Sequence, residues 1–200
     1  MTIKTIIFDA GGVLFLHDWY KLKSHIMKEH NFSILLYSDH PKKIQNKYKG
    51  LNIGKTSFKK VLSGLSGQKD IDLILRDYEK GYKKYQWLNS RLLIFLKKIK
   101  KKYQLFALTN TNDLHFELNT KQGLFKDFKK VYASSKIKVQ KPDKRAFLAV
   151  LKDNHLNPEE VLFVDDQRQN LDVARKLGMN TLIFKNNKKF FKDLKKFGIK

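Results

Sequence analysis

The segment Thr5-Ile6-Ile7-Phe8-Asp9-Ala10-Gly11-Gly12 decides the fold, because a short apolar run stops there at a carboxylate followed by small residues. Four further apolar runs also end in polar residues, and they cover residues 105–108, 131–133, 161–164 and 181–184. Unbroken apolar runs of this length are typical of strands that are buried on both faces of a parallel sheet. We therefore predict a parallel sheet built from these five runs.

Helical patterns separate the predicted strands. Residues 90–99 carry apolar side chains at helical spacing, and Ser90 is the expected N-cap. A second helix is expected over residues 143–152, and a third over residues 169–177, where Gly178 ends it. Strands that alternate with helices predict an α/β protein whose helices cover both faces of a parallel sheet.

The segment from residue 15 to residue 88 interrupts this alternation. Its apolar residues recur at helical spacing, and it contains no convincing strand. We interpret residues 15–88 as a helical cap domain, inserted into a core domain of residues 1–14 and 89–200. Its two tryptophans, Trp19 and Trp87, are expected to pack in the interior.

The composition narrows the class of protein. The chain has 200 residues, and 42% of them are hydrophobic, which is enough to bury a core. It contains no cysteine, so thiolate metal sites and a cysteine nucleophile are excluded. No segment approaches the ~20 apolar residues of a membrane span, and the N-terminal apolar run is too short for a signal peptide. We expect a cytoplasmic protein without a membrane partner.

The charge balance raises the question of a nucleic-acid partner. Lysine and arginine number 42 against 19 acidic residues, which gives a net charge of +23. Such a balance is typical of nucleic-acid binding. However, only five of the basic residues are arginines, the usual readers of bases and phosphates. We favour a solvated, lysine-rich surface that attracts small anions, and keep nucleic acid as the alternative.

The polar residues around the strand ends indicate phosphate chemistry. Ligands bind beyond the carboxyl ends of parallel strands. Those ends carry carboxylates, a hydroxyl and an amide, and a lysine precedes one helix: Asp9, Thr109, Asn110, Lys141, Asp165 and Asp166. Carboxylate oxygens suit Mg²⁺, and lysine and hydroxyl groups donate to phosphate oxygens. Because aspartate can act as the nucleophile in phosphoryl transfer, the pattern predicts a Mg²⁺-dependent enzyme that acts on a phosphate ester.

The chain resembles the haloacid dehalogenase superfamily, whose four motifs occur in order over nearly its whole length. They are Phe8-Asp9-Ala10-Gly11-Gly12-Val13-Leu14, Leu108-Thr109-Asn110-Thr111-Asn112, Lys141-Pro142-Asp143 and Phe163-Val164-Asp165-Asp166-Gln167-Arg168-Gln169-Asn170. One such motif is a weak signal, but four in order are a strong one. The resemblance implies a Rossmann-like α/β core with a small inserted helical cap, and a phosphatase that works through an aspartyl-phosphate.

The resemblance also implies a role for each matching residue. Asp9 would be the nucleophile, and Thr109 and Lys141 would hold the transferred phosphoryl group. The Mg²⁺ ion would be bound by three carboxylates and one backbone carbonyl, with an amide in support: Asp9, Gly11, Asp165 and Asp166, supported by Asn170. The second and third motifs are similar to those of bacterial α-D-glucose-1-phosphate phosphatases, which implies a small sugar phosphate as substrate. Asn110 and His115 would then contact the substrate.

One position departs from the pattern of the superfamily. Most of its phosphatases have a second aspartate two residues after the nucleophile, which protonates the leaving oxygen, whereas this chain has Gly11. The leaving group of a sugar 1-phosphate or an acyl phosphate needs less protonation, so such a substrate fits this site. His17 or Asp18 would be the substitutes for the missing acid.

Two alternative functions remain, a catalytically weak or inactive binding protein and a phosphatase that acts on nucleic-acid ends. Halide removal is the least favoured, because it does not need the Mg²⁺ that the acidic fourth motif implies.

Overall fold

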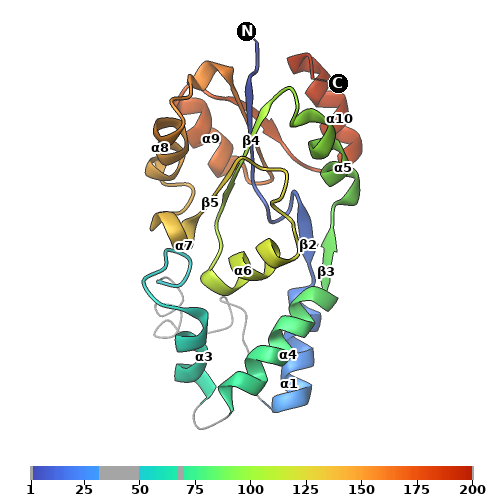
Figure 1. Ribbon diagram of the computed structural model, residues 1–200, viewed down its shortest axis with the longest axis vertical. Helices are drawn as coiled ribbons and strands as arrows, with labels where there is room; N and C mark the ends of the chain where they lie inside the picture. Colours follow the sequence, from blue (N-terminus) through green and yellow to red (C-terminus); the bar gives the residue numbers. More distant parts are fainter. Residues whose placement is uncertain (1, 32–49, 67–69, 200) are drawn as a thin grey trace.

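A five-stranded parallel sheet forms the centre of the molecule in the computed structural model, which describes residues 2–31, 50–66 and 70–199 (Figure 1). The strand order is β5-β4-β1-β6-β7, and every pairing is parallel. The strands are β1 (Thr5–Phe8), β4 (Gln104–Thr109), β5 (Lys130–Ala133), β6 (Val161–Asp165) and β7 (Asn180–Ile183). The predicted fold class and its five strands are thus confirmed.

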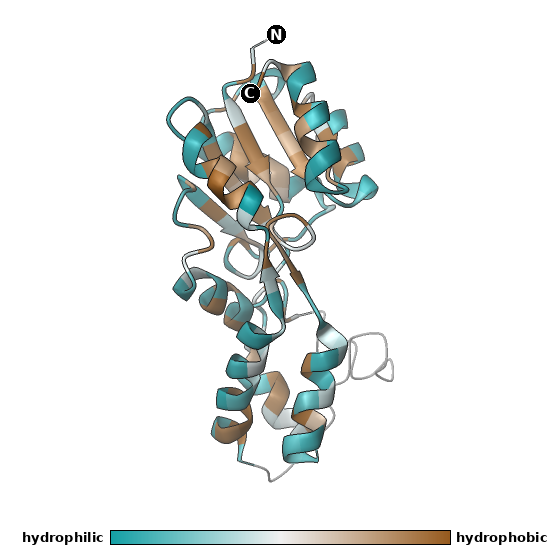
Figure 2. Cartoon of the chain, turned by 90° about the vertical axis from the view of Figure 1, so that its right-hand side faces the viewer, coloured by the Kyte–Doolittle hydropathy of each residue, from teal (hydrophilic) through white to brown (hydrophobic). Residues whose placement is uncertain are grey.

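Helices cover both faces of this sheet (Figure 1). One face packs against α5 (Ser90–Ile99) and α10 (Asn187–Leu194), the other against α8 (Lys144–Asp153) and α9 (Arg168–Lys176). Further helical elements complete the connections: α6 (Asp113–Lys121), α7 (Ser134–Ile137), η2 (Pro158–Glu160) and η3 (Lys195–Phe197). Figure 2 shows the apolar strands enclosed by helices with polar outer faces.

Alternation along β1 explains why the sheet is apolar on both sides. Ile6 and Phe8 belong to the apolar cluster on the α5 side, and Ile7 belongs to the cluster on the α8 side. Successive side chains of a strand point to opposite faces, so a strand between two helical layers needs apolar residues at every position. None of the helices in the described ranges is both long and apolar enough to cross a membrane.

The segment between β1 and α5 contains a pair of strands that the sequence analysis did not predict. β2 (Phe15–His17) and β3 (Gln86–Leu88) pair antiparallel, with Leu16 opposite Trp87. The expectation of no strand in this segment is therefore wrong. Strands of three residues are too short to give a periodic pattern, and their pairing depends on a partner far away in the chain.

The rest of the inserted segment is helical where the structure describes it. Its helices are α1 (Trp19–His30), α3 (Phe58–Ser66) and α4 (Ile71–Lys84), and they share an apolar cluster separate from those of the sheet. In Figure 1 these three helices lie together at the end of the molecule away from both termini. Residues 32–49 and 67–69 of the expected cap lie outside the described residues. The domain boundaries of the cap stay a prediction.

The start of α5 also differs from the expectation. The N-cap is Asn89 instead of Ser90, because the Asn89 side chain accepts a hydrogen bond from the N–H of Leu92 at 3.2 Å. The Asn89 amide group also donates to the carbonyl of Val13 at 2.9 Å and exchanges hydrogen bonds of 2.8 and 3.0 Å with Asn187. Asn89 therefore joins the loop after β1 to the starts of α5 and α10.

Replacing this residue tests the assignment of the cap. We expect Asn89→Ala to lower the free energy of unfolding by about 1–3 kcal/mol, because it removes an N-cap and leaves partly buried partners unpaired. Ser90→Ala is the matched control and should change stability by less than about 0.5 kcal/mol, since the Ser90 side chain is exposed. Urea unfolding of both variants measures the difference. Equal losses in the two variants would contradict the assignment.

Candidate active site

The carboxyl ends of three neighbouring strands bring motif residues together. Because β1 lies between β4 and β6, Asp9, Thr109 and Asp165 stand at one edge of the sheet. Thr109 and Asp165 end their strands, and Asp9 follows β1, where its N–H donates to the carbonyl of Val164 at 2.8 Å. All three side chains are buried. The chain leaves β1 toward β4 and returns on its other side at β6, and such a switch point is where open α/β sheets bind ligands.

Lys141 lies at the centre of this cluster. Its Nζ atom is 2.9 Å from Oδ1 of Asp9 and 2.7 Å from Oδ2 of Asp165, and its side chain is 1% exposed. Asn110 fixes the backbone of the lysine: its amide donates to the Lys141 carbonyl at 2.8 Å, and its Oδ1 accepts from the Lys141 N–H at 2.8 Å. Asn110 thus holds Lys141 in place with both polar atoms of its side chain, and its substrate-binding role stays a prediction.

The carboxylate of Asp165 accepts hydrogen bonds at both of its oxygens. Its Oδ1 accepts hydrogen bonds from the N–H of Gln167 at 2.8 Å and from Nδ2 of Asn170 at 3.0 Å. Its Oδ2 accepts from Lys141 and, at 3.0 Å, from the same amide of Asn170. These contacts occupy the lone pairs of the Asp165 carboxylate. The oxygens that remain open to a ligand therefore belong mainly to the other two carboxylates of the cluster, those of Asp9 and Asp166.

Two carboxyl groups of the cluster, those of Asp9 and Asp166, have raised pKa values. Burial raises the pKa of Asp9 to about 6, while the ammonium group of Lys141 lowers it and the carboxylate of Asp165 raises it. Partial burial and the charge of Asp165 also raise the pKa of Asp166. Three carboxylates beside one ammonium group leave an excess of negative charge, which a divalent cation would neutralise.

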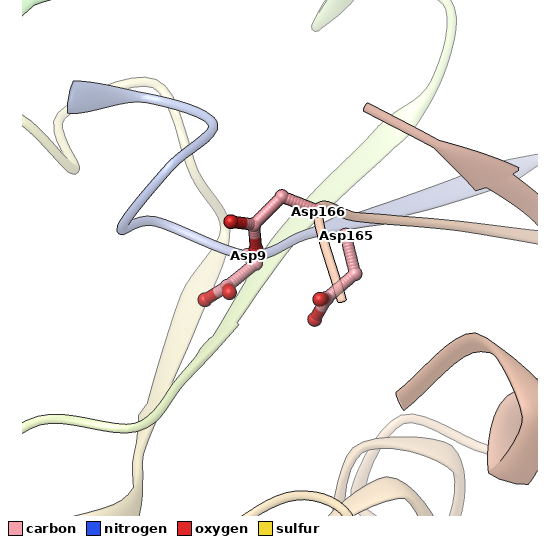
Figure 3. A group of neighbouring side chains, drawn as sticks. All are labelled: Asp9, Asp165 and Asp166. Atoms are coloured by element: carbon pink, nitrogen blue, oxygen red, sulfur yellow. The ribbon is translucent and has the colours of Figure 1, made fainter. Parts of the chain in front are cut away.

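The donor set fits such a cation. One carboxylate oxygen of each of Asp9, Asp165 and Asp166 lies within 4.8 Å of the other two. Figure 3 shows the carboxyl groups of Asp9 and Asp166 directed to the same side. Oδ1 of Asn170 is a buried acceptor without a partner among the described residues. A set of oxygen donors suits Mg²⁺, and the additional ligand expected from the carbonyl of Gly11 stays a prediction.

Gly12 makes room for the third carboxylate. Its φ angle is +76°, in the left-handed region that favours glycine, and a Cβ atom at this position would overlap Oδ2 of Asp166. The loop after β1 can therefore approach the end of β6 only with glycine here. Gly11, by contrast, lies outside the left-handed region, and a Cβ atom added to it would meet only Cζ of Phe15, at 4.0 Å.

A cavity of about 320 Å³ opens above the cluster. The predicted site residues Asp9, Thr109, Lys141 and Asp166 line it, together with residues from the inserted segment and from α6. The sequence analysis did not assign the following lining residues to the site: Phe15, Leu16, Trp19, Tyr82, Asn119, Phe125 and Gln167. Gln167 had a local signal, because it directly follows Asp166 in the fourth motif. Phe15, Leu16, Trp19 and Tyr82 had none, since they belong to the inserted segment and their place depends on the pairing of β2 with β3.

The expectation that both tryptophans lie in the interior is wrong. Trp19 lines the cavity and is 36% exposed, and Trp87 on β3 is 53% exposed. Trp87 is the middle residue of β3, opposite Leu16, and Trp19 begins α1 just after β2. Large aromatic residues that border a cavity are typical of ligand sites.

His115 lies in the wall of the cavity, but its ring nitrogens already have partners. Nδ1 is 3.0 Å from Nδ2 of Asn112, and Nε2 is 2.7 Å from the hydroxyl of Tyr78. Burial, with a smaller contribution from the nearby His17, lowers the pKa of His115 to about 3. The ring is therefore neutral, with Nδ1 accepting from the Asn112 amide and Nε2 donating to the tyrosine oxygen. Its substrate-binding role stays a prediction.

Comparison with known proteins identifies the family. A family model described as haloacid dehalogenase-like hydrolase matches residues 6–184. This range includes the four motifs and the inserted segment. The chain belongs to this family.

Several relatives extend over almost the whole chain. A D-ribitol-5-phosphate phosphatase from Bacteroides thetaiotaomicron is 26% identical over 189 residues, which cover 90% of each chain. The crystal structure of a haloacid dehalogenase family enzyme from the same organism, in complex with magnesium and inorganic phosphate, is 26% identical; it has a TM-score of 0.77, with 92% of this chain and 96% of that chain covered. The structure of a predicted family hydrolase from Porphyromonas gingivalis has a TM-score of 0.81 and 25% identity, with both chains fully covered.

The close approach of Gly12 to Asp166 generates a prediction about metal binding. We expect Gly12→Ala to weaken Mg²⁺ binding by at least about tenfold, because the new Cβ atom displaces a carboxylate ligand. Gly123→Ala is the matched control: its φ angle is +73°, but its Cβ atom would meet only Cδ of Lys126, at 3.8 Å. Both variants should lose about 1 kcal/mol of stability from backbone strain. Titration calorimetry with Mg²⁺ separates them, and equal affinities would count against this role of Gly12.

Proposed function

We propose that this haloacid dehalogenase-like hydrolase is a Mg²⁺-dependent phosphatase that hydrolyses a small sugar phosphate through a phosphoryl group carried on Asp9. The observation that supports it best is the buried contact of Asp9 with Lys141 beside Asp166, in a cavity that these residues line. This arrangement combines a nucleophile, a cation and a set of metal ligands within a few ångströms, and phosphoryl transfer requires all three.

The reaction follows from the positions of these groups. An oxygen of Asp9 attacks phosphorus; the bond between phosphorus and the leaving oxygen breaks, and the leaving oxygen departs with the electron pair and takes up a proton. Water then attacks the phosphorus of the aspartyl-phosphate, which releases inorganic phosphate and restores the carboxylate. Lys141 and Thr109 donate to the phosphoryl oxygens during both steps.

The metal would be bound by the carboxylates that remain open, chiefly Asp9 and Asp166, with Asp165 orienting Lys141. When bound, Mg²⁺ supplies positive charge next to the phosphoryl oxygens and brings the carboxylate of the nucleophile close to an anionic substrate. Support for this cofactor comes from the related enzyme solved in complex with magnesium and inorganic phosphate.

The relative that acts on D-ribitol 5-phosphate supports a sugar phosphate as the substrate class. The volume of the cavity, about 320 Å³, also favours a small ester, since sites for small molecules begin at about 300 Å³. The glucose 1-phosphate suggested by the sequence motifs is one member of this class. Gly11 favours it, because a glycine cannot protonate the leaving oxygen, and the anomeric oxygen of a sugar leaves more readily than an ordinary alcohol oxygen.

The first test is phosphate release from p-nitrophenyl phosphate and a panel of sugar phosphates. We expect release with Mg²⁺, no release with EDTA, and a loss of at least about a thousandfold in Asp9→Asn, which lacks the nucleophile. Asp172→Asn is the matched control, since Asp172 is an exposed residue of α9 that pairs with Arg175 at the surface. A folded protein that binds Mg²⁺ but releases no phosphate would refute the proposal and favour a binding protein.

The open space beside Gly11 allows a second test. We expect Gly11→Asp to fit without a clash and to raise the rate on glucose 6-phosphate relative to glucose 1-phosphate by at least about tenfold, because an added acid helps the poorer leaving group more. Gly11→Asn has the same shape but transfers no proton, so its ratio of rates should stay at the wild-type value. Steady-state kinetics of the three proteins measure the ratio. A similar gain with asparagine would show that shape, not proton transfer, is responsible.

A further inference from the structure

The cavity above Asp9 has two chemically different ends. Its floor carries the charged groups of the site, the carboxylates of Asp9 and Asp166 and the ammonium of Lys141. The remainder of its described lining consists of aromatic rings, amides, hydroxyls and apolar side chains. Lys141 is the one lysine or arginine among the described lining residues, and it is already engaged by two carboxylates.

Four aromatic rings that line the cavity contact one another. The ring of Trp19 stacks on His17 with centroids 4.0 Å apart, and Tyr82 stacks on His115 with centroids 4.6 Å apart. Contacts between Trp19 and His115, at 5.3 Å, and between His17 and Tyr82, at 4.6 Å, join the two pairs. We call these four residues the ring wall. The ring faces pack against one another, and the parts of the rings that border the cavity offer van der Waals contact to the C–H bonds of a ligand.

The ring wall carries no positive charge. Burial lowers the pKa of His17 and lowers that of His115 to about 3, so both rings are neutral at physiological pH. The indole and the phenol of the other two residues are neutral as well, and burial raises the pKa of Tyr82. A negative group placed against this wall would lose its hydration without meeting a cation.

The ring wall does offer a hydrogen bond to a neutral ligand. The hydroxyl oxygen of Tyr82 accepts from Nδ2 of Asn119 at 3.2 Å, and Oδ1 of Asn119 in turn accepts from Nε2 of Gln86 at 2.8 Å. One hydrogen bond to Asn119 does not exhaust the Tyr82 hydroxyl, which can both donate and accept. The hydroxyl group of a ligand can also do both, so it can form a second hydrogen bond with Tyr82.

We infer that the site selects phosphate esters whose leaving group is an uncharged polyol, with its C–H face against the ring wall and one hydroxyl bound by Tyr82. A second phosphate or a carboxylate on the leaving group is rejected, because the described lining holds no cation to pair with it. This inference rests on the proposed phosphatase function and adds the charge and the chemical class of the part of the substrate that lies away from phosphorus.

A matched pair of substrates tests the inference directly. D-Glucose 1-phosphate and D-glucuronate 1-phosphate share the ring and the leaving oxygen and differ only in a CH₂OH or a carboxylate at C6. We expect kcat/KM to be at least about tenfold higher for the glucose ester, since the carboxylate loses its hydration without a partner. Equal values for the two esters would overturn the inference. Release from p-nitrophenyl phosphate, measured alongside, reports on the phosphatase function itself.

Variants of the wall and of the cavity mouth sharpen the test. Tyr82→Phe keeps the ring but removes the hydroxyl, and it should lower kcat/KM on glucose 1-phosphate about tenfold relative to p-nitrophenyl phosphate, the effect of one hydrogen bond. Tyr20→Phe, at a residue of α1 that is 73% exposed, is the matched control and should leave this ratio unchanged.

Leu16→Lys adds a cation at a lining residue that is 62% exposed. It should reduce the preference for the glucose ester over the glucuronate ester about threefold or more.

The outcomes separate this inference from the proposed function. Mg²⁺-dependent release from p-nitrophenyl phosphate without any preference for the neutral sugar ester would leave the phosphatase in place and overturn the inference. The same holds if Tyr82→Phe and Tyr20→Phe behave alike. No release from any ester would overturn both. A preference for the glucose ester that falls in Tyr82→Phe and in Leu16→Lys would support the inference.

Discussion

The contact of one buried ammonium group with two buried carboxylates is the constraint on which the site depends. A charged carboxylate in a protein interior is costly unless it is paired, and two of them side by side also repel each other. Lys141 offsets both costs, since it lies within 3 Å of Asp9 and of Asp165. Because the three residues come from distant parts of the chain, this contact also sets how the loop before α8 meets the ends of β1 and β6. Asn110 keeps the lysine there through its backbone.

The core and its polar edge could be predicted from the sequence because their signals are local. Each of the five strands is a short apolar run, and Asp9, Thr109 and Asp165 are recognisable because they stand at or directly after the ends of such runs. The geometry of a parallel sheet then brings the strand ends to one edge without further information. Local patterns and one rule of sheet geometry were therefore sufficient to bring Asp9, Thr109 and Asp165 to one edge of the sheet.

The features that could not be predicted depend on contacts between distant residues. β2 and β3 have three residues each, and neither would be a strand without the other. The roles of Trp19 and Tyr82 in the cavity follow from that pairing, so their sequence neighbours carry no sign of it. The N-cap of α5 is a similar case: Ser90 fits the local pattern, but Asn89 also reaches Val13 and Asn187, and these additional hydrogen bonds favour it.

The antiparallel pair of β2 and β3 has a consequence for how the enzyme can diversify. The inserted segment enters and leaves the core through two strands that lie next to each other, with Phe15 opposite Leu88. An insert whose two ends are adjacent can change in length or sequence without moving the core residues on either side of it. The ends of the parallel strands then keep their positions. Three rings of the wall belong to this insert, whereas Asp9, Lys141 and Asp165 belong to the core. Changes in the insert can therefore alter the wall of the cavity and leave the buried charged cluster as it is.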